Sequence, residues 1–169
     1  MQTEISAPSC ILTAERIKRA IRRMAFQIAE NNATETSIIL AGIIGNGTVV
    51  AGQIRDELSR IINLPVVVYT VSLNKKKPLD ATINSEMDFN GQVIILIDDV
   101  SNTGKTLLYA LKPFLHFEPK KIQTLVLVER SHKLFAVQPD YVGLSVATTL
   151  QEHISVEIDG KQITGAWLY

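Results

Sequence analysis

Short apolar runs alternate with longer amphipathic segments along the first 130 residues. The apolar runs are rich in β-branched residues and predict buried strands at 37–43, 66–71, 93–97 and 122–128. Segments with apolar residues at helical spacing lie between them and predict helices at 13–32, 48–62 and 105–115. Residues 73–91 are polar without a clear period, so we expect a long, mobile loop there.

The alternation of strands and helices is typical of an α/β fold with a mainly parallel, twisted sheet and helices on both faces. Beyond residue 130 the pattern changes to short strands at 141–146 and 154–158. Asp159-Gly160 is a hairpin turn signal, so 161–169 should return as a strand and complete a small C-terminal β region. The length suits a single domain spanning 1–169.

Composition narrows the function classes. The chain has 17 basic and 17 acidic residues, so we expect no chain-wide attraction to nucleic acid, and a homo-oligomer is compatible with this neutrality. The single cysteine, Cys10, excludes an internal disulfide and a cysteine-rich metal site. We see no signal peptide and no apolar run near the ~20 residues of a membrane span, which favours a cytoplasmic protein.

The segment 93–107, VIILIDDVSNTGKTL, carries the clearest chemistry. A predicted strand ends in Asp98 and Asp99, and a polar turn then leads into the helical segment at 105. Backbone N–H groups of such a turn can hold a phosphate, and the acids suit sugar hydroxyls or a cation. The segment therefore predicts a site for a phosphorylated sugar. Because adjacent residues of a strand point to opposite sides, Asp99 is expected to face the ligand more directly.

Other interpretations of this segment stay open at this point. The end of the segment is similar to a nucleoside-triphosphate P-loop, but that motif needs a glycine where this chain has Asp99. A solvated surface turn is a second alternative. The two acids could also serve only in helix capping or in a salt bridge.

The spacing of Asp-Asp-Val, two variable residues and Thr-Gly-Lys-Thr closely resembles the signature of the type I phosphoribosyltransferases. The resemblance implies phosphoribosyl pyrophosphate (PRPP) as ligand, with Mg²⁺ arriving on its pyrophosphate and no metal held by the protein alone. Asp98 and Asp99 would face the ribose hydroxyls as the catalytic acids. The 5-phosphate would be wrapped by Ser101, Asn102, Thr103, Gly104, Lys105 and Thr106.

A second turn, Gly45-Asn46-Gly47, takes the place of the family's pyrophosphate loop. It lacks the usual Arg or Lys, so a charge-assisted hydrogen bond worth about 1.5–3 kcal/mol is missing. Lys75-Lys76-Lys77 replaces the basic clamp of the family's loop with point charges. These departures leave open a protein that binds PRPP but turns over slowly.

Residues 124–149 extend the resemblance toward the uracil phosphoribosyltransferases that also attenuate pyrimidine operons. It implies that Tyr141 stacks on the nucleobase and that the backbone of Val142 binds the edge of the base. Asn102 stands where purine enzymes often carry an acid, which favours a pyrimidine enzyme. The expected reaction is uracil plus PRPP to UMP plus pyrophosphate, in pyrimidine salvage, with a purine phosphoribosyltransferase as the alternative.

A hypothesis of a different class is a nucleotide-sensing RNA-binding regulator with weak or no catalysis. Arg16, Arg19 and Arg23 share one face of the first predicted helix and are its candidate RNA contacts. The competing interpretation is an ordinary solvated helix face.

Overall fold

A six-stranded sheet forms the centre of the computed structural model, which describes residues 7–149 and 151–169. Its strand order is β4-β3-β2-β5-β6-β7, and every pairing is parallel except that of β4. The strands are β2 (Ile38–Ile43), β3 (Val66–Ser72), β4 (Thr82–Ile83), β5 (Val93–Ser101), β6 (Lys121–Arg130) and β7 (Tyr141–Val146). The predicted α/β fold with a mainly parallel sheet is confirmed.

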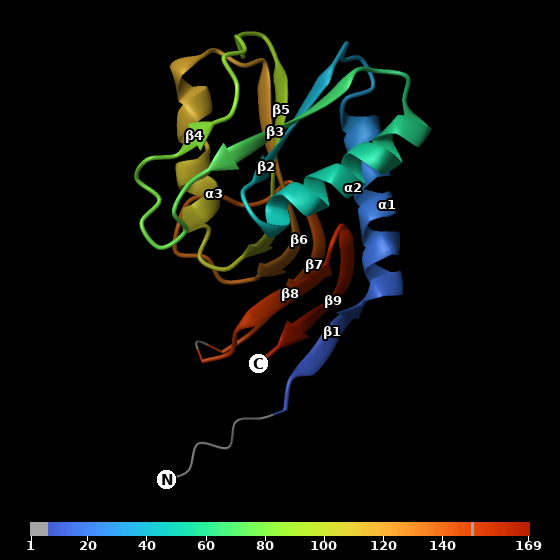
Figure 1. Cartoon of the computed structure of the whole chain (residues 1–169), viewed down its shortest axis with the longest axis vertical. Helices are drawn as coiled ribbons and strands as arrows, with labels where there is room; N and C mark the ends of the chain where they lie inside the picture. The colour runs from blue at the N-terminus through green and yellow to red at the C-terminus, as the bar shows by residue number, and fades with distance from the viewer. Residues whose placement is uncertain (1–6, 150) are drawn as a thin grey trace.

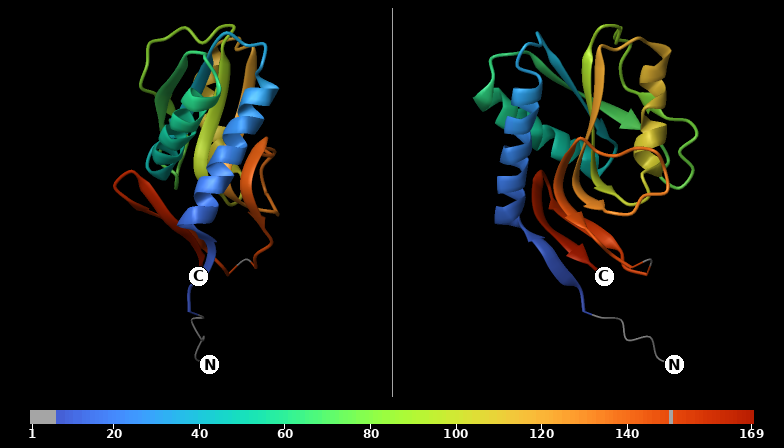
Figure 2. Two further views of the ribbon diagram at one scale, coloured as in Figure 1. Left: turned by 90° about the vertical axis from the view of Figure 1, so that its right-hand side faces the viewer. Right: turned by 180° about the vertical axis from the view of Figure 1, so that it is seen from behind.

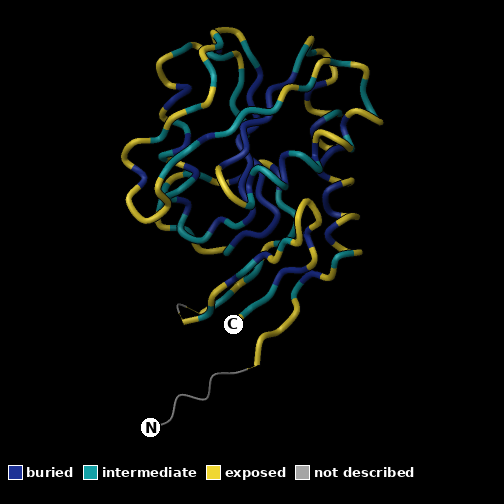
Figure 3. Tube along the Cα trace, viewed as in Figure 1, coloured by how far each residue is buried: buried dark blue, intermediate teal, exposed yellow. Residues whose placement is uncertain are grey.

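Helices cover both faces of this sheet (Figures 1 and 2). The helices are α1 (Ala14–Asn31), α2 (Asn46–Ile61), α3 (Lys105–Ala110) and the 3₁₀ helix η1 (Lys112–His116). Helices α1 and α2 bury their apolar sides on one face, and α3 with η1 packs on the other, which gives two separate hydrophobic cores. The buried trace in Figure 3 follows the central strands between these layers.

Local sequence explains where the helices begin and end. Thr13 caps α1, because its side-chain oxygen accepts a hydrogen bond from the backbone N–H of Arg16 at 3.3 Å. The helix predicted at 105–115 is divided into α3 and η1. Pro113 lies within the predicted span and cannot donate the hydrogen bond that an α-helix needs there.

The 73–91 segment is more ordered than predicted. Ile83 pairs with Val71 through the short strand β4. Phe89 is fully buried and makes edge-to-face contacts with Tyr69, Phe114 and Phe117. The prediction of a mobile loop is therefore wrong for its second half, because an aromatic cluster anchors it to the sheet. The stretch 74–81 has no aromatic anchor of this kind and is held instead by the contact of Lys75 with Asp98 and by a hydrogen bond from Lys112 to the carbonyl of Leu79 at 2.8 Å.

A second, antiparallel sheet completes the described structure, with strand order β1-β9-β8. Strands β8 (Ile154–Asp159) and β9 (Gln162–Leu168) form the predicted hairpin, and Gly160 at its turn has φ +60°. Strand β1 (Ser9–Thr13) was not predicted from its sequence and pairs with β9. The N-terminal six residues, part of the segment without a predicted signal peptide, lie outside the described residues. Among the described residues no helix is long and apolar enough to cross a membrane.

We predict that Gly143→Ala destabilises the protein strongly. A Cβ at this position of β7 would lie 2.3 Å from the backbone oxygen of Leu127 on β6, so one of the two strands must shift. The expected loss in the free energy of unfolding is about 3 kcal/mol, measured by urea denaturation. Gly52→Ala is the matched control, since a Cβ there meets nothing within 4 Å. The control should gain up to about 1 kcal/mol from helix propensity; equal stabilities for the two variants would contradict the prediction.

Candidate functional site

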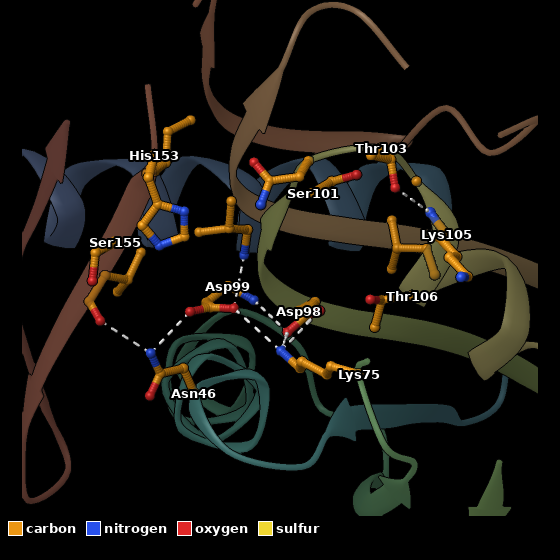
Figure 4. A pocket seen from close by; sticks show the side chains of 16 residues that line it. Asn46, Lys75, Asp98, Asp99, Ser101, Thr103, Lys105, Thr106, His153 and Ser155 are labelled. Carbon is orange, nitrogen blue, oxygen red and sulfur yellow. Dashed lines mark hydrogen bonds and ion pairs between the residues drawn. The ribbon is translucent and has the colours of Figure 1, made fainter. Parts of the chain in front are cut away.

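A cavity of about 410 Å³ lies between the carboxyl end of β5 and strand β8. Such a volume is in the usual range for a small-molecule site. Its walls come from the start of α2, the 73–81 segment, the β5–α3 connection and β8 (Figure 4). The lining residues are Asn46, Lys75, Asp98, Asp99, Val100, Ser101, Asn102, Thr103, Gly104, Lys105, Thr106, Leu107, His153, Ile154, Ser155 and Val156.

The two acids lie inside strand β5, and both line the cavity. Asp98 is 1% exposed and Asp99 8% exposed. The ammonium of Lys75 lies 3.0 Å and 3.3 Å from the two carboxylate oxygens of Asp98 and 3.7 Å from Oδ1 of Asp99. On the other side, the Asn46 amide donates to Oδ2 of Asp99 at 2.9 Å. The acid pair is therefore held from both sides, by a cation on Asp98 and an amide on Asp99.

Burial changes the protonation of this cluster. Removal from water and the neighbouring charge of Asp99 raise the pKa of Asp98 to about 7, although Lys75 opposes this shift. Burial alone would lower the pKa of Lys75, but the charges of Asp98 and Asp99 outweigh it and raise that pKa above its ordinary value. Lys75 therefore stays charged near neutral pH, where Asp98 is partly protonated.

The predicted phosphate turn lies at the same cavity, and all six residues from 101 to 106 line it. Gly104 has φ +85°, a left-handed conformation that other residues adopt only with strain. The Thr103 hydroxyl oxygen accepts a hydrogen bond from the backbone N–H of Lys105 at 3.2 Å. Two buried oxygens of the turn, Ser101 Oγ and Asn102 Oδ1, have no protein partner.

The turn at 45–47 places the side chain of Asn46 in the site, and its two glycines allow the sharp entry into α2 and the close approach of α2 to β5. Asn46 lines the cavity and bridges Asp99 to the carbonyl of Val156 on β8, at 2.9 Å and 3.0 Å. Gly45 has φ +92°, which permits the sharp entry into α2. A Cβ on Gly47 would lie 3.1 Å from a carboxylate oxygen of Asp98, so only glycine lets α2 approach β5 this closely. Gly45 and Gly47 shape the site without lining it.

Tyr141 and Val142 lie away from this cavity, which corrects the predicted base contact. Tyr141 begins β7 level with Ile97 in the sheet register, but it lies two strands away from β5 and is only 2% exposed. Its hydroxyl donates to Gln123 and accepts from Asn31, at 2.9 Å and 3.2 Å. The ring belongs to the core beneath α1 and therefore cannot stack on a ligand at the carboxyl ends of the strands.

The wall that sequence reasoning missed is the start of β8. His153, Ile154, Ser155 and Val156 face the acid pair and the phosphate turn across the cavity. Figure 4 shows the ring of His153 and the Asn46 amide on the same side of the cavity as Asp99. No motif marks this segment, because a partner strand 50 residues away in sequence is placed only by the fold. The signal for this wall in the sequence was His153, which directly precedes the alternating apolar and polar residues of 154–158.

The three arginines of the predicted RNA face do gather in one place, a groove along α1 and β7 that also includes Gly143 and Leu144. They are not equivalent. Arg23 donates to the carbonyls of Val142 and Gly143 at 3.0 Å and 2.9 Å, whereas Arg19 makes an exposed ion pair with Glu15. No cluster of three or more His, Cys, Asp or Glu side chains suited to a metal ion occurs in residues 7–149 and 151–169.

Asp98 should give the stability of the protein a specific pH dependence. Its pKa rises from 3.8 to about 7 on folding, so its stabilising contribution is present below pH 4 and is lost as the pH rises through 7. Relative to Asp98→Asn, the wild type should lose on the order of 4 kcal/mol of unfolding free energy over this range. Urea denaturation of both proteins at several pH values measures it. Parallel stability curves would contradict the prediction.

Comparison with known proteins agrees with this geometry. Residues 9–160 match the family model of the phosphoribosyl transferase domain. "Bifunctional protein PyrR" of Haemophilus ducreyi is 32% identical over 159 residues, with 88% of this chain and 89% of the relative covered. The protein of the same name from a Streptococcus pneumoniae strain is 36% identical over 149 residues, with 84% and 85% covered.

Solved structures share the fold. The hypoxanthine phosphoribosyltransferase of Trypanosoma cruzi superposes with a TM-score of 0.76 at 16% identity, covering 93% of this chain and 95% of that one. A hypoxanthine-guanine phosphoribosyltransferase from Bacillus anthracis gives 0.68 at 18% identity, covering 82% of each chain. From the family match and its PyrR relatives, this chain belongs to the phosphoribosyl transferase domain family and is a phosphoribosyltransferase.

Proposed function

We propose that the protein transfers ribose 5-phosphate from PRPP to uracil and releases pyrophosphate. The observation that carries this proposal is that a single cavity contains both the acid pair of β5 and all six residues of the phosphate turn. A ribose 5-phosphate has hydroxyls that can bind the acid pair and a phosphate dianion that can bind the 101–106 turn. The site is thus suited to both ends of one phosphorylated sugar.

Mg²⁺ fits the same cavity as a companion of PRPP. Hard oxygen ligands suit this ion, and Asp98 and Asp99 offer them side by side. Two carboxylates are too few to hold it alone, so the remaining ligands would be oxygens of PRPP and water. When bound, the ion neutralises charge on the leaving pyrophosphate. The ammonium of Lys75 already contacts both carboxylates, so it must move aside or bind them together with the ion when Mg²⁺ enters.

Strand β8 supplies an edge that suits the uracil base. Reciprocal backbone hydrogen bonds join His153 to Tyr169, so the N–H and C=O groups of Ile154 and Val156 point to the other edge of the strand. The Val156 carbonyl accepts from Asn46, which lines the cavity, so this edge faces the site. Along it the backbone offers a donor, an acceptor and a donor. Uracil presents the complementary acceptor, donor and acceptor, whereas cytosine does not.

The protein's own contribution is positioning and electrostatics. The 101–106 turn fixes the 5-phosphate, and Asp98 and Asp99 fix the ribose. The negative acid pair stabilises positive charge that develops on the ribose as the bond from C1 to pyrophosphate breaks and the bond to the base forms. The 74–81 stretch brings Lys75 over the site and limits access of water.

Asp99→Asn should lower PRPP-dependent turnover by at least about 100-fold, because it removes a charge that binds the ribose and stabilises the transition state. The measurement is pyrophosphate release with PRPP, Mg²⁺ and uracil. Asp56→Asn is the matched control, since Asp56 is an exposed acid of α2 outside the cavity, and it should retain wild-type turnover.

A panel of bases in the same assay tests the substrate. Uracil should support turnover and cytosine should not. Faster turnover with hypoxanthine or guanine than with uracil would replace the pyrimidine assignment with a purine one. Near-normal turnover of Asp99→Asn would contradict the proposed site.

RNA binding is a second candidate function, favoured by the groove of about 420 Å³ that Arg16, Arg19 and Arg23 line together. The name of the PyrR relatives, "Bifunctional protein PyrR", is compatible with a second activity. We also expect the protein to be a homo-oligomer and to be located in the cytoplasm. Arg23 donates to two backbone carbonyls of β7, so we assign the phosphate contacts to Arg16 and to Arg19, whose ion pair with Glu15 is exposed.

Replacing both Arg16 and Arg19 by Ala should weaken RNA binding in a salt-dependent way, lowering the slope of log affinity against log salt by about 2. A gel-shift titration with structured RNA at several salt concentrations measures this change. Arg55→Ala is the control, because Arg55 is an exposed cation of α2 outside the groove. If the wild type shows no RNA affinity at low salt, this second function is excluded.

A further inference from the structure

The connection between β6 and β7 lies directly against the phosphate turn, although it lines no part of the cavity. The backbone N–H groups of Leu134 and Phe135 both donate to the carbonyl of Thr103, each at 3.0 Å. The Phe135 carbonyl lies 3.3 Å from the point that a Cβ on Gly104 would occupy, so the two segments are in close backbone contact. The two hydrogen bonds from Leu134 and Phe135 to Thr103, which we call the backbone clamp, therefore hold the turn on the side away from the cavity.

The two hydrogen bonds to the Thr103 carbonyl also determine which way the next N–H group of the turn points. In a trans peptide the C=O of one residue and the N–H of the next point in opposite directions. Two hydrogen bonds that fix the Thr103 carbonyl toward the β6–β7 connection therefore turn the Gly104 N–H away from it. Gly104 lines the cavity, so this N–H is directed to the side where a phosphate would bind.

A buried ion pair holds the connection in place. The ammonium of Lys133 lies 2.5 Å from Oε2 of Glu129, and the two side chains are only 7% and 8% exposed. Lys133 also donates to the carbonyl of Arg130 at 3.2 Å, which closes the first turn of the connection onto the end of β6. Glu129 pairs with Ser101 across the β5–β6 ladder, so the pair is anchored beside the start of the phosphate turn.

Stability alone does not account for a buried ion pair here, because taking both charges out of water offsets most of their attraction. Leu134, next to Lys133, is 83% exposed, so hydrophobic burial of its side chain does not hold this part of the connection. What fixes residues 134 and 135 is their backbone clamp on Thr103 together with the ion pair beside it.

We propose that Lys133, through its ion pair with Glu129, is a positioning residue that holds Leu134 and Phe135 against Thr103 and so keeps the 101–106 turn in its phosphate-binding form. The proposal rests on the proposed function only in taking the bound group to be the phosphate of a phosphorylated sugar. Lys133 touches no reacting atom.

The first test uses Lys133→Met, with Lys133→Arg as the conservative variant. Calorimetric titration with ribose 5-phosphate should show at least a 10-fold loss of affinity in Lys133→Met and recovery of most of it in Lys133→Arg. In turnover assays KM for PRPP should rise at least 10-fold, while KM for the base changes less than 3-fold. Equal loss for both substrates, or wild-type ribose 5-phosphate affinity in Lys133→Met, would overturn the proposal.

A second variant keeps the test decisive if Lys133→Met does not fold. Leu134→Pro removes one of the two N–H donors to Thr103 while altering a side chain that is exposed. It should lose ribose 5-phosphate affinity at least 5-fold and speed hydrogen exchange at the Lys105 amide. Leu134→Ala, which keeps the donor, should match the wild type in both measurements. Unchanged affinity and exchange in Leu134→Pro would also overturn the proposal.

Different results would contradict the proposed function and the positioning role of Lys133. If the wild type binds neither ribose 5-phosphate nor PRPP, the proposed function fails. If the wild type binds them and the variants bind equally well, the proposed function stands and the positioning role of Lys133 fails.

Discussion

Two carboxylates in the buried central strand β5 are the constraint on which the rest of the site depends. Asp98 and Asp99 lie in β5 just beyond its last pairing with β2, and burial makes their charges unfavourable unless partners reach them. Lys75 and Asn46 come from opposite sides to do so. The close approach of α2 that brings Asn46 to this point requires a glycine at 47. Charge burial thus fixes the positions of α2 and of the 73–81 segment together.

The elements that sequence predicted well are those whose signal is local. Strand β5 and its polar turn are contiguous in sequence, so the acid pair and residues 101–106 were identified together. Helix α1 was predicted from one apolar stripe and the cap at Thr13. Helix α3 was predicted too long because the apolar period continues through Pro113, and the missing N–H of proline outweighed it. Local chemistry decided each of these cases.

What could not be predicted depends on contacts between distant segments. Tyr141 resembles a base-stacking residue in sequence, yet its ring is buried in the core beneath α1 and does not line the cavity. The β8 wall reaches the site only because β1 and β9 form a second sheet beside the first, and β1 has no clear strand pattern of its own. Likewise, Phe89 orders a polar segment through an aromatic cluster that residue spacing does not reveal.

Arg23 has a consequence for how the molecule behaves in a crowded solution. Strand β7 is the last strand of the main sheet, and an open edge of this kind offers backbone groups to the strands of other molecules. By donating to the carbonyls of Val142 and Gly143, the guanidinium occupies acceptors that a foreign strand would need. Arg23, which the sequence predicted as an RNA contact, is therefore placed to protect this edge of the sheet against edge-to-edge aggregation.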